Sequence, residues 1–539
     1  MRDCKKGFIS ISVVYAFLIL FIFLMLAILA SYISRENLLS KLIGQSKDII
    51  YKDNSSEDID NNITIKIFVD GIYSKLFPSK KYYAYSPDTS YCNNGAELDF
   101  NSKNWDASAS RITGKTTCII EFVSKSSNLV PGGEDYTEEV LLYEEEILNG
   151  SYPVLKGDLI PVIIEQDETD GWKVTYADIT QEWYKYEDSE WANAVRLIDE
   201  PSTTYGAGMV IDHEDISAYF VWIPKYRYKL FNMGDYNSLV AGELEPKNQL
   251  IKIKFGSSDT KNSDTSCKTP MESGASGSCS VGKWMTHPSF ISFDSIGYWV
   301  GKFEVTGSIS AITVLPGVNS LVNQTVSAMF TNAYNYKRAL DSHMMKNTEW
   351  GAVAYLGNSN YGIGNTPIWK NNNSNYVTGC VGDQEIDTEV ASCENAWYTT
   401  TGKKGSVTGN ITGVYDMSGG AWEYMAAYRA ETMGSSGFTS ETIAGYNAKY
   451  FDVYPSDTTI NSFNKRILGD ATGELGPFNS YGYSSWYDDN SYFVYSSYPW
   501  FMRGDRSGHG VIAGSFACGG LTGGINSTIG FRLVLTPKE

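Results

Sequence analysis

GVYDMSGGAWEYM, Gly413 to Met425, is the stretch that predicts the scaffold of the C-terminal half of the chain. Gly419 and Gly420 permit backbone angles that other residues disfavour, so the chain can turn tightly there. Trp422 follows two residues later, and its large apolar ring is expected to anchor the segment in a core. The stretch therefore predicts structure rather than chemistry.

Segments on the N-terminal side of this turn have the periodicity of two strands and a helix. In FVWIPKYRYKLF (Phe220 to Phe231) and GYWVGKFEVTG (Gly297 to Gly307), large apolar residues alternate with polar ones, as half-buried strands require. MMKNTEWGAVAYL (Met344 to Leu356) has apolar residues at helical spacing. Asn347 or Thr348 is expected to cap the start of this helix.

These four segments and FMRG…GFRLVL, Phe501 to Leu535, occur in an order that resembles the sulfatase-modifying-factor family. The best-known member of that family is the formylglycine-generating enzyme. The resemblance runs from Tyr219 to the end of the chain and implies a C-type-lectin-like fold. The predicted fold class is accordingly α+β and β-rich, and 38 Tyr and 50 Gly with only 16 Pro suit such a fold better than a helical bundle.

The resemblance also raises an enzymatic alternative, an oxidoreductase of the formylglycine-generating type. In that enzyme the C-terminal segment carries two cysteines a few residues apart, which hold copper. The matching segment here contains only Cys518, and one thiolate cannot supply a two-cysteine copper site. His509 could approach Cys518 in space, and Gly420 stands where the family usually has an Asn linked to calcium. The sequence therefore predicts that the protein is not an enzyme.

The matching segment, RGDRSGHGVIAGSFACGGLTGGINSTIGFR at Arg503 to Arg532, allows three interpretations. It could display an adhesive Arg-Gly-Asp, but the family commonly has Arg-Gly-Gly here, which places Arg503 and Gly504 in the scaffold. It could hold an oxidising cysteine. It could also be a display loop, because Asp505 to Thr528 contains no Lys, Glu, Gln, Met or Trp. In this it resembles lectin-fold proteins diversified by retroelements, whose mutated Asn codons cannot encode those residues.

The display loop is expected to bind a ligand together with the aromatic run before it, YGYSSWYDDNSYFVYSSYPWF at Tyr481 to Phe501. Trp500 and Phe501 are expected in the core, and the alternative is that the whole run packs internally. Asp488 and Asp489 suggest a calcium ion, with solvated loop charges as the alternative. The predicted ligand-binding residues are Asp505, Arg506, Ser507, His509, Val511, Ser515, Ala517, Cys518, Leu521, Asn526, Trp486, Tyr487 and Tyr498.

Near the N-terminus, residues 8–33 (FISISVVYAFLILFIFLMLAILASYI) carry no charge and exceed the ~20 apolar residues that cross a bilayer. They predict a single transmembrane helix, with a cleaved signal peptide as the alternative. Lys5 and Lys6 favour a cytoplasmic N-terminus, so the bulk of the chain is expected outside the cell membrane.

The junction between Gly7 and Phe8 resembles the leader of a type IV prepilin, which a peptidase would cut there. Pilins usually carry Glu as the fifth residue after the cut, and this chain has Ser12 at that position. A minor pilin-like subunit in a pilus-like assembly is therefore an alternative to a plain membrane anchor.

Six of the eight cysteines fall into local pairs, which favours three disulfide bonds in an oxidising compartment. Zinc is the competing interpretation, but the chain contains no CxxC and only four histidines, so no metal site is predicted from them. The predicted pairs are Cys92 with Cys118, Cys267 with Cys279, and Cys380 with Cys393.

Composition and turn signals divide the chain into parts with different expected roles. The formal charge of -19 repels phosphate backbones and argues against a nucleic-acid partner. The expected parts are a leader (1–7), a transmembrane helix and stalk (8–50), a small β-sandwich-like domain (63–125), a linker with a Trp-rich region (126–200) and a lectin-like domain (201–539). Together they predict a surface-anchored, non-catalytic binding protein for an unknown protein or glycan, without a cofactor unless calcium binds.

Overall fold

The computed structural model describes residues 63–69, 72–74, 83–92, 96–101, 106–110, 116–124, 152–167, 171–231, 250–255, 284–382, 388–458, 467–474 and 486–538. The chain divides into two compact units, Met1–Leu142 and Tyr143–Glu539. Cys267, Cys279 and the predicted leader, transmembrane helix and stalk lie outside the described residues.

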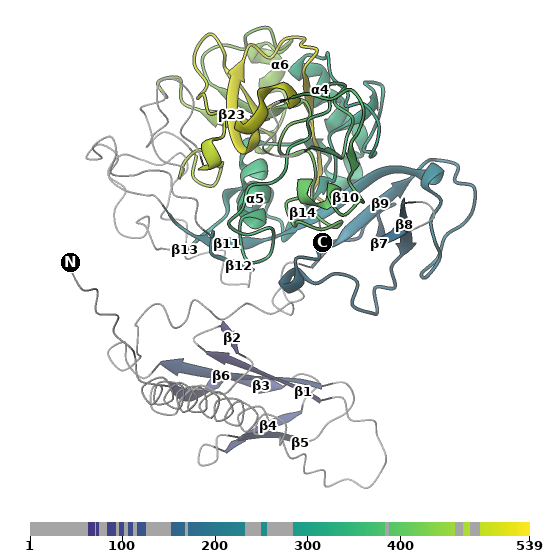
Figure 1. The fold of residues 1–539 in the computed structure, drawn as a ribbon. Helices are drawn as coiled ribbons and strands as arrows, with labels where there is room; N and C mark the ends of the chain where they lie inside the picture. The colour runs from purple at the N-terminus through teal and green to yellow at the C-terminus, as the bar shows by residue number, and fades with distance from the viewer. Residues whose placement is uncertain are drawn as a thin grey trace, which may run out of the picture. The chain divides into compact units, whose positions relative to one another are not determined.

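The first unit contains one sheet of four strands in the order β2-β1-β6-β3 and a separate hairpin of two strands (Figure 1). Within the sheet, β1 and β6 run parallel, while β3 and β6 run antiparallel. The strands are β1 (Ile63–Val69), β2 (Ile72–Ser74), β3 (Tyr83–Cys92), β6 (Thr116–Ser124) and, in the hairpin, β4 (Glu97–Asn101) and β5 (Asp106–Ser110).

Aromatic contacts and a disulfide hold the first unit together. Phe100 of the hairpin stacks on Tyr85 of β3, with ring centroids 4.2 Å apart, and contacts Phe122 of β6 at 5.4 Å. Cys92 and Cys118 face each other in the β3·β6 pairing and form a disulfide, which confirms that predicted pair. Because β6 lies inside the sheet, the disulfide joins an edge strand to an inner strand.

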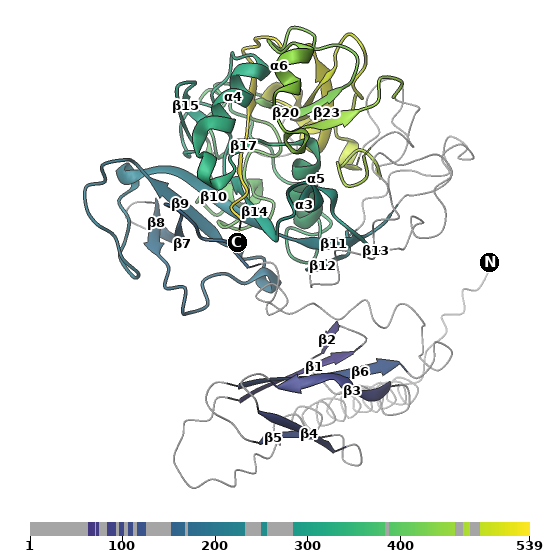
Figure 2. The ribbon, with the colours of Figure 1, turned by 180° about the vertical axis from the view of Figure 1, so that it is seen from behind.

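The second unit is built on a seven-stranded antiparallel sheet in the order β17-β25-β14-β10-β9-β7-β8 (Figures 1 and 2). The C-terminal strand lies between two earlier strands of this sheet, so the end of the chain closes the core. The strands are β7 (Ile160–Asp167), β8 (Gly171–Tyr176), β9 (Asn193–Leu197), β10 (Ile216–Pro224), β14 (Gly297–Gly301), β17 (His343–Met344) and β25 (Leu533–Leu535).

A second sheet of this unit has the order β21-β20-β22-β23, and a further strand, β24, pairs with β20. Its strands are β20 (Trp422–Arg429), β21 (Asp452–Tyr454), β22 (Trp500–Gly504), β23 (Gly514–Leu521) and β24 (Ile529–Phe531). The smaller pairings involve β11 (Tyr226–Lys229), β12 (Ile253–Phe255), β13 (Trp284–Thr286), β15 (Thr306–Ser308), β16 (Ala311–Thr313), β18 (Cys380–Val381) and β19 (Asn395–Ala396).

The helices of the second unit are short. The α-helices are α3 (Pro288–Phe293), α4 (Val326–Tyr336), α5 (Asn347–Gly357) and α6 (Ser440–Ala444). The 3₁₀ turns are η2 (Tyr186–Asp188), η3 (His213–Asp215), η6 (Arg338–Leu340), η7 (Gly402–Gly405), η8 (Ala448–Tyr450), η10 (Trp486–Asp488) and η11 (Ser507–Ile512).

The fold class is β-rich as expected, but its predicted transmembrane element is corrected. Within the described ranges, no helix combines the length and the apolar character that crossing a bilayer requires. The longest, α4 and α5, have 11 residues each, which corresponds to about 16 Å of helix against a hydrocarbon core of about 30 Å. The predicted localisation as a single-pass membrane protein is corrected for the same reason. Residues 8–33 themselves lie outside the described part.

The boundary expected at residue 201 also differs from the structure. Residues 152–200, expected to connect two domains, contain β7, β8 and β9 of the seven-stranded sheet. Their tryptophans pack in that core: Trp191 is buried, and its Nε1 donates to the carbonyl of Tyr361 at 2.6 Å. The tryptophans of this region therefore belong to the core: Trp191 is part of it, and Trp172 and Trp183 pack against it.

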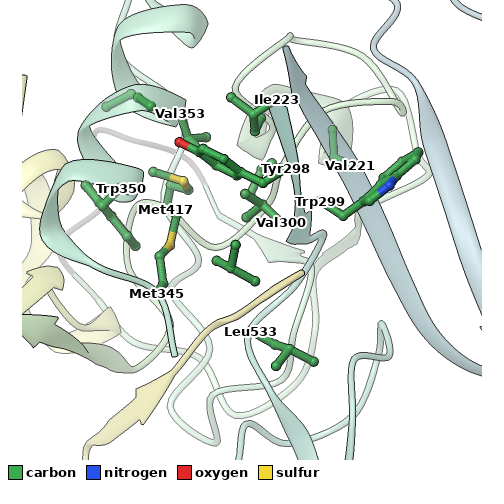
Figure 3. Packing of buried hydrophobic residues seen from close by; sticks show 14 of the residues in the cluster. Val221, Ile223, Tyr298, Trp299, Val300, Met345, Trp350, Val353, Met417 and Leu533 are labelled. Carbon is green, nitrogen blue, oxygen red and sulfur yellow. The ribbon is translucent and has the colours of Figure 1, made fainter. Parts of the chain in front are cut away.

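The two segments predicted to form half-buried strands contain β10 and β14, which are buried on both faces. Strand β11, at the end of the first segment, alternates as predicted: Tyr226 and Tyr228 are buried, and Arg227 and Lys229 are partly exposed. In β14 every residue is buried, and in β10 only Ser217 is partly exposed. Trp222 of β10 and Trp299 of β14 meet edge to face with ring centroids 5.2 Å apart. Figure 3 shows Trp299 and Val300, adjacent on β14, pointing to opposite sides of that strand. The prediction failed for β10 and β14 because tryptophan and tyrosine, which are aromatic residues with polar tips, also fill a core.

Helix α5 is the buried central helix of the second unit. All of its residues are buried, and Figure 3 shows Trp350 and Val353 directed into the core. Lys346 precedes the first helical residue, and its backbone N–H donates to Glu349 at 2.8 Å. The predicted cap at Asn347 or Thr348 is therefore wrong by one or two residues, because both are already helical.

Replacing Gly351 in α5 by Ala is expected to lower the free energy of unfolding by about 2 kcal/mol net. A Cβ at this position would lie 1.9 Å from the carbonyl oxygen of Gly469, so the buried segment 467–474 must move. Overpacking of this kind costs about 3 kcal/mol, whereas the gain in helix propensity is only about 1 kcal/mol. Urea unfolding followed by tryptophan fluorescence measures the change, since every tryptophan except Trp105 lies in the second unit.

Gly206→Ala is the matched control. A Cβ added there meets nothing within 4 Å, so the stability should stay the same or rise slightly. Equal stabilities for the two alanine variants would mean that segment 467–474 does not pack against α5 as described.

The turn that opens β20 has the predicted form. Gly419 and Gly420 both have φ of +73°, and a Cβ on Gly419 would lie 2.3 Å from the carbonyl oxygen of Asn371. Trp422 is 6% exposed and belongs to the core cluster. The glycines are therefore required by the backbone, and the tryptophan anchors the strand, as the sequence predicted.

Candidate functional site

The segment Arg503 to Arg532 forms the end of β22, the turn η11 and the strands β23 and β24. Strand β23 is the edge strand of its sheet and pairs with β22 on one side. On its other side a short segment approaches: the N–H of Cys518 donates to Asn490 at 2.9 Å, and the N–H of Tyr492 donates to Cys518 at 2.7 Å. Residues 490–492 thus cover the edge of β23.

The Arg-Gly-Asp tripeptide lies inside the protein. Arg503 is fully buried, and its Nη1 donates to Asn347 at 3.2 Å and to the carbonyl of Asp470 at 3.0 Å. Asp505 is also fully buried. The prediction that Arg503 and Gly504 belong to the scaffold is confirmed, and a buried tripeptide cannot act as an adhesive motif.

Several predicted ligand-binding residues are inaccessible to a ligand. The hydroxyl of Ser507 donates to Glu389 at 2.6 Å, and the ring of Trp486 lies 5.1 Å from that of Phe516. The thiol of Cys518 lies 3.8 Å from the carbonyl oxygen of Tyr492. The buried members of the predicted set are Trp486, Asp505, Ser507, Ser515, Ala517 and Cys518.

The other predicted residues keep part of their side chains at the surface. Val511 is 49% exposed and Tyr498 is 38% exposed. Tyr487 is half-buried, and its hydroxyl lies 3.1 Å from Oδ1 of Asn358. The accessible members are Tyr487, Tyr498, Arg506, His509, Val511, Leu521 and Asn526.

Two exposed tyrosines were not among the predicted residues. Tyr492 is 43% exposed and Tyr495 is 48% exposed, and the Tyr495 ring lies 5.1 Å from that of Tyr498. Phe493 and Val494 between them are buried. The sequence SYFVYSSY held the signal, because residues without a polar group occupy the core positions and the tyrosines flank them.

The turn after β22 is held by a buried carboxylate. Asp505 has φ of +60°, a left-handed conformation that is unusual for a residue with a side chain. Its Oδ2 accepts a hydrogen bond from Nδ2 of Asn490 at 2.8 Å, and its Oδ1 accepts one from the N–H of Arg506 at 2.7 Å. Nδ1 of His509 lies 2.5 Å from the same Oδ1. This network fixes the turn.

Asp489 belongs to the support of β23. It is buried, and its Oδ2 accepts a hydrogen bond from the N–H of Phe516 at 2.8 Å. Burial raises the pKa of Asp489 to about 8, with a smaller contribution from the nearby Asp505 carboxylate. Over the described residues, no three His, Cys, Asp or Glu side chains are grouped so that they could share a metal ion. Calcium at Asp488 and Asp489 stays a prediction.

A buried ionic cluster underlies β20 and β24. Nε and Nη2 of Arg532 donate to the two carboxylate oxygens of Glu423 at 3.1 and 2.5 Å, and both side chains are fully buried. Burial raises the pKa of Glu423 to about 7 and that of Glu304 well above its usual range. Arg532 acts in the opposite direction on both carboxyls and therefore limits the cost of burying them.

The oxidoreductase alternative requires an accessible thiol, and the thiol at this site, Cys518, is buried. Cys518 has no exposed surface, so a substrate thiol cannot reach it without opening the edge of β23. Cys380 and Cys393 form a disulfide, as predicted. The third predicted pair, Cys267 with Cys279, lies outside the described residues.

No family model matches the chain, and no curated protein matches it. Among solved structures, one match is a chain described as "Major Tropism Determinant I1 Variant", which is 11% identical. That match covers 72% of this chain and 97% of the other, with a TM-score of 0.24. The likeness is weak, and the resemblances to the sulfatase-modifying-factor family, to retroelement-diversified lectin-fold proteins and to type IV prepilins stay predictions.

Proposed function

We propose that this chain is a non-catalytic ligand-binding protein whose contact surface lies along the edge of β23. Three exposed tyrosines, Tyr492, Tyr495 and Tyr498, are the observation that supports the proposal. Tyrosine offers a large contact area with two rotatable bonds and a hydroxyl for adaptable hydrogen bonds, so it loses little entropy on binding. Their backbone is rigidly attached, because residues 490–492 bond to β23 and Phe493 and Val494 are buried.

The turn η11 belongs to the same framework. The N–H of Asn490 donates to the carbonyl of Ile512 at 2.8 Å, while its side chain holds Asp505. One residue thus joins the tyrosine segment to the turn, which begins directly after Arg506 and carries His509 and Val511. The partly exposed residues of the turn extend the proposed surface, and the buried residues of the display loop form its base.

This division also refines the diversification hypothesis. Asp505, Ser507, Ala517 and Cys518 are fully buried, so arbitrary replacements there would leave cavities, clashes or unpaired polar groups. Accessible positions accept replacement within about 0.5 kcal/mol. Variation without loss of the fold is therefore expected at accessible positions such as Arg506, Val511 and Asn526.

The triple variant Tyr492→Ser, Tyr495→Ser, Tyr498→Ser tests the proposal. The labelled full chain would be applied to a glycan array and a peptide array, and the strongest hit titrated with both proteins. Loss of three aromatic contacts is expected to weaken the affinity about thirtyfold, or about 2 kcal/mol.

Tyr91→Ser with Tyr152→Ser is the matched control, because these tyrosines are 55% and 41% exposed and lie outside the proposed surface. The control should bind like the unmodified chain, and thermal unfolding should show that all variants are folded. A hit that the triple variant binds with unchanged affinity would refute the proposed surface.

A further inference from the structure

The side chain of His509 connects the buried carboxylate of Asp505 to an arginine at the surface. Nε of Arg506 donates a hydrogen bond to Nε2 of His509 at 3.1 Å. Since Nε2 accepts, the proton of the neutral imidazole lies on Nδ1, which faces Asp505 at 2.5 Å. The three side chains therefore form a chain of contacts from the interior to the surface.

This chain of contacts fixes Arg506 but leaves its terminal nitrogens available. Nε is held by His509, whereas neither Nη1 nor Nη2 donates to any residue in the part of the chain that the structure describes. Arg338, also at the surface, differs: its Nη1 donates to the carbonyls of Tyr334 and Ser342, and its Nη2 donates to Tyr450. Arg506 thus presents an oriented, unused pair of donors.

A guanidinium fork of this kind matches the two oxygens of a carboxylate, which it can bind through two parallel hydrogen bonds. The fork is orientated in advance, so less side-chain entropy is lost on binding than for a mobile surface arginine.

We propose that Arg506 binds a carboxylate of the ligand, and that this carboxylate is an aspartate or glutamate side chain of a protein. The inference rests on the proposed function and names the chemistry of its ligand. Half-exposed Val511 on the same turn and the tyrosines joined to it through Asn490 favour a protein, since arginine and aromatic residues are enriched where proteins meet.

The net charge of -19 does not prevent an acidic side chain of the ligand from binding to Arg506 once the two groups are in contact. At physiological ionic strength the field of distant surface charges is screened beyond about 8 Å, whereas a bidentate pair forms at about 3 Å. Two carboxylates of the described residues contact the turn, and both already accept hydrogen bonds: the buried Asp505 from Asn490 and Arg506, and Glu389 from the hydroxyl of Ser507.

The test uses a capped Gly-Glu-Gly tripeptide as the probe and its Gly-Gln-Gly counterpart as the uncharged control. The full chain, labelled with ¹⁵N in arginine only, is titrated while the Nε–H signals are recorded, and the Arg506 signal is assigned by its loss in Arg506→Lys. The Glu peptide is expected to shift this signal saturably and to bind about tenfold more tightly than the Gln peptide.

Variants separate the binding residue from the residue that positions it. Arg506→Gln should lower the affinity for the Glu peptide about tenfold, while Arg338→Gln, with its nitrogens already used, should leave it unchanged. His509→Ala should lower the affinity about threefold because Arg506 is released. His509→Gln keeps an acceptor for Nε and should restore binding to within twofold.

Equal affinities for the Glu and Gln peptides, or an unchanged affinity in Arg506→Gln, would overturn the proposal. N-acetylneuraminic acid is the second carboxylate source, and tighter binding of this acidic sugar than of the Glu peptide would overturn the assignment to a protein. These outcomes are independent of the tyrosine test. The carboxylate site can be refuted while the tyrosine surface is supported, and the tyrosine surface can be refuted while the carboxylate site is supported.

Discussion

Arg532→Met is expected to lower the free energy of unfolding by about 3–5 kcal/mol at pH 8, because it leaves the buried Glu423 without its partner. Arg532 and Glu423 are both fully buried and share two hydrogen bonds. Nη1 of Arg532 also donates to the carbonyl of Gly301 at 2.9 Å, so the same substitution removes a link from the residue between β24 and β25 to β14.

The size of this loss should depend on pH. Burial raises the pKa of Glu423 to about 7 in the folded protein. A carboxyl with a raised pKa keeps its proton when folded and loses it when unfolded, so stability falls as pH rises from about 4.5 through the folded pKa. Without Arg532 that pKa rises further. The loss should therefore be roughly half as large at pH 5, where the carboxyl stays protonated.

Urea unfolding at pH 5 and pH 8, each compared with the unmodified chain at the same pH, measures both effects. The double variant Arg532→Met, Glu423→Gln should regain much of the loss at pH 8, because no uncompensated charge remains. Lys173→Met removes the exposed pair with Glu165 and should cost less than about 1 kcal/mol. A loss in Arg532→Met that is the same at both pH values would show that Glu423 does not carry the effect.

The parts of the fold that the sequence predicted depend on local chemistry. Gly419 and Gly420 adopt left-handed angles that few other residues tolerate, and Trp422, Trp500 and Phe501 are too large and apolar to stay exposed. Such positions can be recognised one at a time. The two faces of β10 could not, because their burial depends on what the rest of the chain places against them.

The candidate site was predictable as a region but not residue by residue. A segment rich in Gly looks like an exposed loop, yet Asp505 and Ser507 turn inward because Asn490 and Glu389 supply their partners. Glu389 lies far from Ser507 in the sequence, so no local pattern predicts that contact. The aromatic run was misjudged in the same way: Trp486 is buried, whereas Tyr492 and Tyr495 are exposed.

Trp350→Ala is expected to lower the free energy of unfolding by about 3–5 kcal/mol and to loosen the base of the proposed binding surface. Nε1 of Trp350 donates to the carbonyl of Ser515 in β23 at 2.7 Å, and a Cβ on Gly504 would lie 3.2 Å from its ring. The guanidinium carbon of Arg503 lies 5.8 Å from the ring centroid. The ring therefore fills the space between α5 and the strands that carry the turn η11.

Removing that ring leaves a cavity beside a buried cation, and the remaining structure can collapse into it only partly. Trp350→Phe is the matched control, because it keeps most of the ring and removes the hydrogen bond to Ser515, at an expected cost of about 1–2 kcal/mol. Urea unfolding gives the two losses, and hydrogen exchange of residues 514–521 reports β23 directly. Faster exchange in Trp350→Ala than in Trp350→Phe is expected. Equal protection of β23 in both variants would mean that α5 does not support the edge to which the exposed tyrosines are attached.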